Sequence, residues 1–197
     1  MHASAKPPPF LALSEPDIEW LVMGPHTFSV SELEALGLVS WLWQHSPMNR
    51  NWSVGSMGRL VEPAFEHRQF ALAKHKNGMP LFYTSWARLD EGRERKLIAD
   101  SKSLSPSDWA SGGHIWMMDW IAPHGGTSFF HKALGSELFP SKVCWALRVR
   151  QDPRTVTIQQ FRGQGVPRSE RAMQWRRLQG NLSRLAHPSF AQSAVRA

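Results

Sequence analysis

The spacing of apolar residues divides the chain into segments of helical and of extended character. In residues 29–46 apolar residues recur every three to four positions, which predicts an amphipathic helix. Ser29 or Ser31 can cap this helix, and acidic residues follow in its first turn. Its predicted apolar stripe consists of Leu33, Leu36, Val39 and Leu42. Further helices are predicted over residues 128–139 and 169–185.

The extended segments form hairpins. Residues 69–89 contain two strand-like runs on either side of Asn77 and Gly78, a pair typical of tight turns. The segment HIWMMDWIAP, residues 114–123, predicts a strand that Pro123 ends. Residues 143–150 and 155–163 predict a second pair of strands, joined across the sequence QDPR.

The order of these elements predicts one α+β domain, with a mainly antiparallel sheet and flanking helices. A chain of 197 residues fits a single domain with a substantial core. Residues 29–186 are expected to form this domain. Residues 1–28 are expected to be a partly disordered N-terminal extension, and residues 187–197 a C-terminal tail.

Composition narrows the class of protein. An apolar content of 42% and a charged content of 20% are typical of a globular protein. The one cysteine, Cys144, lies in the apolar stretch VCWALRV, so a buried thiol is expected rather than a disulfide or a nucleophile. No apolar run approaches the roughly 18 residues of a membrane span, and the first residues lack the order of a signal peptide. We therefore expect a cytoplasmic protein without stable membrane insertion.

The positive charge is concentrated in the C-terminal third. The net charge is +7, and the stretch from Arg148 onward holds ten arginines but only Asp152 and Glu170 as acidic residues. A basic surface of this kind suits nucleic acid, anionic lipid or an acidic protein. No zinc-finger or RNA-binding motif is present, so an acidic protein partner is favoured over nucleic acid. The candidate docking residues are Arg148, Arg150, Arg171, Arg176 and Arg177.

Several motifs occur together in one order along the chain. They are LGLVSWLWQHSPMNRNWSV, GMPLFYTSWARL, DWASGGHIWMMDWIAPHG and ALRVRQDP with VTIQQFRG. In this combination, from about Leu36 to Gly163, the chain resembles the RTX toxin-activating lysine acyltransferases. The resemblance implies a GNAT-like acyltransferase fold. It also implies transfer of a fatty acyl group from acyl carrier protein to internal lysine ε-amines of a protoxin in the bacterial cytoplasm, with no bound cofactor and no metal.

The resemblance also implies two catalytic positions, a histidine within SP.HR.W and the aspartate of DWIAP. The aspartate is Asp119, whereas the position of the histidine is occupied by Asn49. Strand alternation predicts that Asp119 shares a face with Met117 and Ile121, and that Trp116, Met118 and Trp120 share the other. Arg50 can pair with Asp119 or with a phosphate of the carrier's prosthetic arm, and a solvated arginine is the alternative. The expected substrate-binding residues are Ser46, Arg50 and Trp120.

The missing histidine matters because of the chemistry of lysine. A lysine side chain has a pKa of about 10.4 and attacks an acyl donor only as the free amine. A neutral imidazole can take its proton, but an asparagine amide cannot. Ser46 and Pro47 predict a helix start, which would place residue 49 in the first turn, where the helix dipole keeps an imidazole neutral.

Several explanations of Asn49 stay open. The chain is a natural homologue with lost or altered activity, a variant with its base replaced, or an enzyme that uses another base. His45 and His124 are the candidate substitutes. The alternative function is a catalytically inactive homologue that binds acyl carrier protein or a protoxin. The acyl chain length stays open, and a homodimer is an assembly that the sequence allows.

Overall fold

A seven-stranded sheet forms the centre of the molecule. The computed structural model describes residues 17–27, 30–149 and 156–183. The strand order is β2-β1-β3-β4-β5-β6-β7, and all neighbours are antiparallel except the parallel pair β5–β6. The strands are β1 (Ile18–Met23), β2 (His26–Thr27), β3 (Phe70–His75), β4 (Pro80–Leu89), β5 (His114–Ile121), β6 (Val143–Val149) and β7 (Val156–Arg162).

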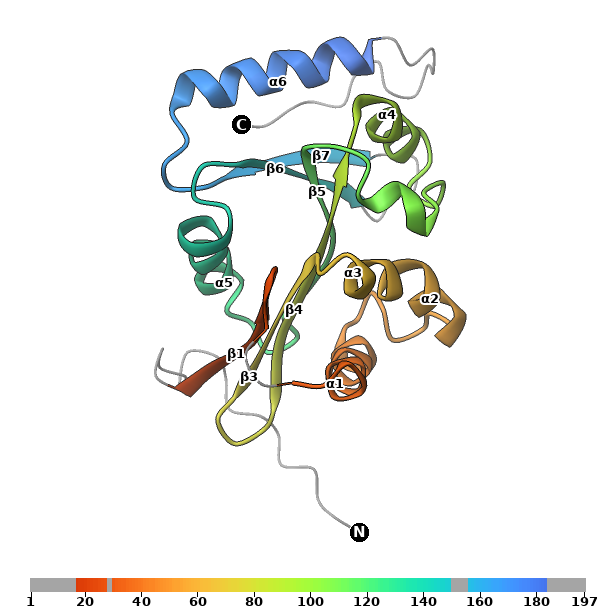
Figure 1. Ribbon diagram of the computed structural model, residues 1–197, viewed down its shortest axis with the longest axis vertical. Helices are drawn as coiled ribbons and strands as arrows, with labels where there is room; N and C mark the ends of the chain where they lie inside the picture. Colours follow the sequence, from red (N-terminus) through yellow and green to blue (C-terminus); the bar gives the residue numbers. More distant parts are fainter. Residues whose placement is uncertain (1–16, 28–29, 150–155, 184–197) are drawn as a thin grey trace.

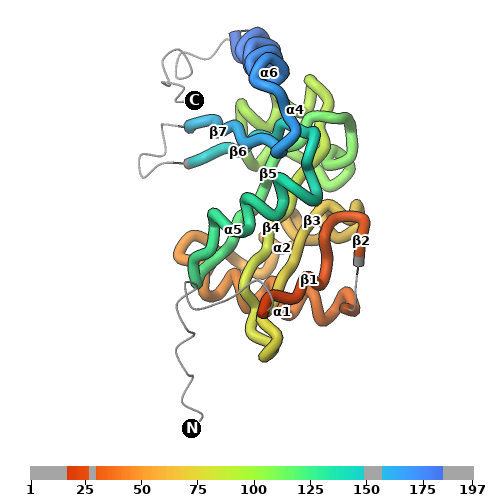
Figure 2. The backbone as a smooth tube through the Cα atoms, turned by 90° about the vertical axis from the view of Figure 1, so that its left-hand side faces the viewer, coloured from red at the N-terminus to blue at the C-terminus, as the bar shows by residue number. Residues whose placement is uncertain are grey.

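Helices cover both faces of this sheet, as in the expected GNAT-like α+β fold. One face packs against α1, α2, α3, α4 and α6, and the other packs against α5 (Figure 1). Figure 2 shows α5 in front of the central strands, with α1 and α2 behind them. The helices are α1 (Glu32–His45), α2 (Met57–Leu60), α3 (Glu62–Glu66), α4 (Glu91–Ala99), α5 (Thr127–Ala133), which continues into a π-helical turn at Leu134–Leu138, and α6 (Arg168–Leu182).

The first helix begins where its sequence predicts. Ser31 caps α1, with its hydroxyl accepting a hydrogen bond from the backbone N–H of Glu34 at 3.2 Å. The buried stripe, however, is rotated relative to the predicted one. Leu33 is 82% exposed, while Trp43 is buried against the sheet. The assignment of Leu33 to the core was therefore wrong, because the helix turns its Ala35 side toward β4.

The predicted hairpins are confirmed. β3 and β4 pair across a turn in which Gly78 has φ of +93°, a conformation that favours glycine. The turn is also held by the Asn77 side chain, which accepts a hydrogen bond from the Met79 backbone N–H. β6 and β7 pair in register from Val143 with Arg162 onward. The connection between them lies outside the described residues.

Part of the predicted N-terminal extension belongs to the sheet. β1 lies within residues 1–28 and pairs antiparallel with β3. Its six residues were not recognised as a strand because a single short run carries little periodic signal. The sequence also gave no indication of α4 or of the short helices α2 and α3. None of the described helices is long and apolar enough to cross a membrane.

The C-terminal helix is anchored by a buried carboxylate. Glu94 on α4 is fully buried and accepts two hydrogen bonds from Arg177 on α6, at 2.7 and 2.9 Å. It also accepts hydrogen bonds from Trp116 on β5 and Asn181 on α6. Burial raises the pKa of Glu94, but Arg177 outweighs this effect and the pKa lies below its ordinary value. Three elements distant in sequence, α4, β5 and α6, thus meet at one charge, and α6 is fixed against the sheet.

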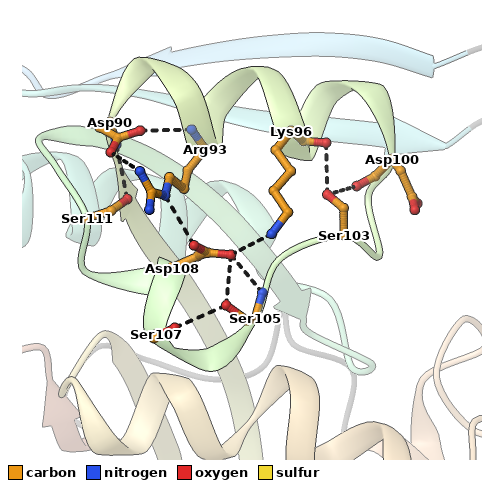
Figure 3. A network of polar contacts seen from close by, with 9 residues as sticks. All are labelled: Asp90, Arg93, Lys96, Asp100, Ser103, Ser105, Ser107, Asp108 and Ser111. Carbon is orange, nitrogen blue, oxygen red and sulfur yellow. Dashed lines mark hydrogen bonds and ion pairs between the residues drawn. The ribbon is translucent and has the colours of Figure 1, made fainter.

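A second polar network closes the loop that precedes β5. Asp108 accepts hydrogen bonds from Lys96 and Arg93 of α4 and from the backbone N–H of Ser105 (Figure 3). These donors, Lys96 first, hold the pKa of Asp108 well below its ordinary range. The neighbouring Trp109 is buried. The motif DWASGG therefore ties this loop to α4 and fixes the start of β5.

Candidate active site

The candidate site lies where the turn after α1 meets the end of β5. Ser46 is the C-terminal cap of α1, and its hydroxyl donates a hydrogen bond to Oδ1 of Asn49 at 2.7 Å. The backbone N–H groups of Asn49 and Arg50 both donate to the Ser46 carbonyl, which closes a tight turn. Asn49 is only 3% exposed, so this turn directs its side chain into the protein.

This geometry corrects the predicted helix start at Ser46. No helix begins there: residues 47–50 form a turn, and Ser46 ends α1. The residue at position 49 therefore does not lie in the first turn of a helix. An imidazole at this position would be kept neutral by burial rather than by a helix dipole.

Asp119 reaches the same place because β5 contains a bulge. Ser85 of β4 pairs with Asp119, whereas the next residue, Trp86, pairs with Met117. Met118 is thus the extra residue, and alternation shifts by one position after it. Trp116 packs in the cluster below α1, while Trp120 packs on the α5 side. The predicted common face of Trp116 and Trp120 was therefore wrong, and Asp119 faces the turn that holds Asn49.

The carboxyl of Asp119 is in an environment that favours its protonated form. Asp119 is 8% exposed, and burial raises its pKa to about 7. The Asn49 amide lies close enough to oppose this shift in part. Nevertheless, Oδ2 of Asp119 and Nδ2 of Asn49 make no hydrogen bond of normal geometry with the residues that the structure describes. Each of these two atoms thus keeps unused hydrogen-bonding capacity within the described residues.

Two hydroxyl groups near Asp119 were not anticipated from the sequence. Ser85 lies directly across from it, and Tyr83 lies two residues earlier on the same face of β4. Both are fully buried. Burial, followed by the charge of Asp119, raises the pKa of Tyr83 well above its ordinary value. The polar residues within the otherwise apolar run LFYTSWA were the only signal for this cluster.

The two histidines proposed as substitute bases lie together near the end of α1. His45 is exposed and stacks on Trp41 at 3.7 Å between ring centroids, and its Nδ1–H donates a hydrogen bond to the Trp41 carbonyl at 2.8 Å. The ring centroids of His124 and Trp41 are 5.6 Å apart. Burial, and to a smaller extent the charge of His45, lowers the pKa of His124. Neither histidine contributes to the pKa of Asp119.

The predicted substrate-binding residues occupy different environments. Ser46 is buried within the turn, and Arg50 is exposed. Within the described ranges Arg50 forms no ion pair, so the predicted pairing with Asp119 is not present. Trp120 packs edge-on against Phe82 and Phe161, on the opposite face of the sheet from Asp119.

The arginines expected to dock a carrier also differ in their contacts. Arg148 on β6 and Arg176 on α6 are exposed. Arg171 lines an open pocket of about 500 Å³ between α5, β7 and the start of α6, together with Lys132 and Arg162. Arg177 is occupied by the buried Glu94. Arg150 lies outside the described residues.

Two further expectations concern metal and thiol chemistry. Across residues 17–27, 30–149 and 156–183, no group of three or more potential ligands has the arrangement of a metal site. Cys144 is buried, and burial raises the pKa of its thiol well above the ordinary value. A neutral, inaccessible thiol is a poor nucleophile, which agrees with a structural role.

Comparison with known proteins points to one family. Residues 28–162 match the RTX toxin acyltransferase family. The RTX-I toxin-activating lysine-acyltransferase ApxIC of Actinobacillus pleuropneumoniae is 38% identical over 134 residues, 68% of this chain and 77% of that protein. The protein-lysine myristoyltransferase HlyC of Escherichia coli is 42% identical over 123 residues, 62% of this chain and 68% of that protein. The leukotoxin-activating lysine-acyltransferase LtxC of Aggregatibacter actinomycetemcomitans is 36% identical over 133 residues, 68% of this chain and 78% of that protein.

Proposed function

Because the chain belongs to the RTX toxin acyltransferase family, we propose that it is a protein-lysine fatty acyltransferase. It moves an acyl group from acyl carrier protein to internal lysine ε-amines of an RTX-type protoxin. The observation that carries this proposal is the buried pair of Asn49 and Asp119, at the two positions that the family resemblance assigns to catalysis. Asn49 in place of the family histidine alters the activity but leaves the geometry of the site in place, because the turn that directs residue 49 toward Asp119 is intact.

The edge of β5 provides support for a thioester donor. Among the described residues β5 pairs with β6 only from Ile115 to Met117, so the edge of β5 beyond Met117 faces no described strand on the β6 side. An extended chain with amide groups can hydrogen-bond to such an edge. The prosthetic arm of an acyl carrier protein is a chain of this kind. Bound there, it runs beside Asp119, and its thioester reaches the acceptor lysine.

The reaction proceeds by attack of the lysine amine on the thioester carbonyl. The ammonium first loses a proton, and its nitrogen then forms a C–N bond as the C–S bond breaks. The thiolate leaves with a proton from the attacking nitrogen, and the proton removed first is released to solvent. Positioning of the two reactants in a closed site supplies much of the rate enhancement, to which proton abstraction adds roughly 10²–10⁴-fold.

The proposed activity is tested by a transfer assay. The purified chain is incubated with acylated carrier protein and with lysine-bearing segments of an RTX protoxin, and mass spectrometry locates acyl groups on individual lysines. We expect acyl-amide products with the unmodified chain and their near loss with Asp119→Asn. Absence of product across carriers, chain lengths and pH values would contradict an acyltransferase function.

The docking of the carrier is tested separately. Acyl carrier proteins are acidic, so reversing the charges of Arg148, Arg171 and Arg176 to Glu should weaken binding and its dependence on salt. Arg59→Glu on α2 makes the same change of charge at another exposed site and serves as the control. Binding that is unchanged in the three variants, or equal at low salt and about 0.5 M salt, contradicts this docking surface.

The alternative is a non-catalytic protein that binds a carrier or a protoxin. Asn49 favours it, because an asparagine amide cannot accept a proton. Under this alternative the chain binds acylated carrier protein in a salt-dependent manner but yields no acyl-lysine, and Asn49→His restores none. Formation of any acyl-lysine that depends on Asp119 rejects it.

A further inference from the structure

Two buried hydroxyl groups face Asp119 from β4. Ser85 is its direct partner across the β4–β5 ladder, which places their side chains on one face and in neighbouring positions. Tyr83 lies two residues earlier on that face and is near enough for the charge of Asp119 to raise its pKa. Neither hydroxyl makes a hydrogen bond of normal geometry within the described part of the chain, although Ser85 is close enough to moderate the pKa of Tyr83.

Such an arrangement is unusual for a purely structural cluster. Buried polar groups in folded proteins nearly always have hydrogen-bond partners, because an unpaired group costs free energy. Four buried groups converge here, Oη of Tyr83, Oγ of Ser85, Oδ2 of Asp119 and Nδ2 of Asn49, and none has a hydrogen bond of full geometry among the described residues. They lie close to one another in two pairs, Tyr83 with Ser85 and Asn49 with Asp119. Packing alone would have been served better by apolar side chains of similar volume. The cluster therefore holds polar groups whose pairing can change during function.

The chemistry of the four groups distinguishes their roles. A hydroxyl can donate a hydrogen bond to a carboxylate and can rotate to accept one from a protonated carboxyl. The amide of Asn49 can hold a ligand or a carboxylate but cannot take a proton. Tyr83 stays neutral, because burial and Asp119 raise its pKa. Only Asp119 can therefore gain and lose a proton in this cluster, and it is surrounded by groups that accommodate both of its states.

We propose that Ser85 and Tyr83 are positioning residues whose hydroxyls follow the protonation state of Asp119, so that Asp119 itself accepts the lysine proton that Asn49 cannot take. This role rests on the lysine acyl transfer proposed above. The N–H bond of the ammonium breaks and an O–H bond forms on Asp119, which leaves the lone pair of the amine free to attack. Ser85 and Tyr83 then rotate from donating to the carboxylate to accepting from the carboxyl. Release of this proton to solvent restores the carboxylate.

Three polar residues face Asp119 and can influence the pKa of its carboxyl. They are Tyr83 and Ser85 from β4 and Asn49 from the turn after α1. Burial raises the pKa of Asp119 and the hydrogen bond of Asn49 lowers it, with no cation among these influences. A hydroxyl that rotates to donate to the ionised carboxylate adds to the effect of Asn49. Its loss should therefore move the pKa of Asp119 upward, by on the order of one unit for a donor to a buried charge.

The first experiment follows the Asp119 carboxyl by carbon-13 NMR between pH 5 and pH 9 in protein labelled at aspartate. The Asp119→Asn variant assigns the signal. We expect Ser85→Ala and Tyr83→Phe each to raise the midpoint by about one unit. Thr84→Val is the matched control, since Thr84 lies between them but points to the α5 face, where its hydroxyl donates to the backbone carbonyl of Asp119. It should destabilise the fold without moving the midpoint.

The second experiment measures transfer over the same pH range. In Ser85→Ala and Tyr83→Phe the acidic limb of kcat should move to higher pH with the carboxyl midpoint, while KM for the acceptor changes little. Unchanged midpoints, or shifts equal to that of Thr84→Val, overturn the role of the hydroxyls. An acidic limb that persists in Asp119→Asn overturns the role of Asp119 as proton acceptor. If neither the unmodified chain nor any variant transfers an acyl group, the acyltransferase function and this catalytic role both fail. Midpoints of the Asp119 titration that still move in that case support only the contact between the hydroxyls and Asp119.

Discussion

The pH dependence of acyl transfer distinguishes a chain that uses Asp119 as its base from one that has no base. Burial raises the pKa of Asp119 to about 7, so its ionised fraction rises from about 0.1 at pH 6 to about 0.9 at pH 8. A rate that depends on this carboxylate therefore increases about tenfold over the interval and then levels off. A rate that depends only on free amine increases about 100-fold and continues to rise toward the lysine pKa of about 10.4.

Replacing Asp119 with Asn removes the acceptor but keeps the size of the side chain. At pH 7 only about 1 in 2,500 lysine side chains is uncharged, so a variant without a base depends on a small population. We expect Asp119→Asn to be slower by roughly 10²–10⁴-fold at pH 7. The deficit should shrink to less than about tenfold at pH 10, where much of the lysine is already a free amine.

Single-turnover transfer from a preacylated carrier to a lysine peptide measures both profiles without interference from product release. Circular dichroism and thermal unfolding show whether Asp119→Asn is folded at each pH. A tenfold rise per pH unit in the unmodified chain between pH 8 and pH 9.5 would refute the reasoning. So would a deficit of Asp119→Asn that is the same at pH 7 and pH 10, because a structural defect does not depend on the free-amine fraction.

Three further substitutions test other parts of the structure. Asn49→His should increase transfer by less than about 100-fold, because Asp119 already accepts the proton, and a larger gain in single-turnover rate would show that the base had been absent. Glu94→Gln should lower the free energy of unfolding, measured in urea, by about 3–5 kcal/mol, because it leaves Arg177 without its counter-charge. The control Glu91→Gln removes an exposed ion pair with Arg95 and should lower the free energy of unfolding by less than about 1 kcal/mol. Asp108→Asn should cost about 1–3 kcal/mol at pH 7. The pKa of Asp108 is lower in the folded protein than in the unfolded chain, so the stabilisation is fully present at a pH above the unfolded pKa and is lost as the pH falls below about 4. The melting temperatures of Asp108→Asn and the unmodified chain should therefore converge in acid.

The sequence was sufficient for elements whose signals are local. The capping serine and the acidic first turn predicted α1, and the Asn77–Gly78 pair predicted the β3–β4 hairpin. These features act within a few residues, so their outcome depends little on the remainder of the chain. Positions 49 and 119 were identified from a resemblance rather than from periodicity, and the structure brings them together.

The sequence failed where the outcome depends on distant partners. Ser46 and Pro47 carry the residue types of a helix start, yet α1 extends to His45 and Ser46 becomes its C-terminal cap. The arginines of the last third appeared as one basic surface, but Arg177 is held by Glu94, 83 positions earlier in the chain. A local pattern cannot show which of several similar side chains a buried charge will take as its partner.

The chain alone thus determines an α+β domain, its main hairpins and the family positions of the site. The tertiary structure decides which way Asp119 points. Simple alternation places Trp116 and Trp120 on one face of the sheet. However, β5 pairs with β4 through a bulge at Met118, so each following side chain of β5 lies on the face opposite to the one that alternation predicts. Register is set by the packing of both sheet faces, and a shift of one residue exchanges them. Asp119 faces Asn49, Ser85 and Tyr83 because of this one extra residue, which no local pattern reveals.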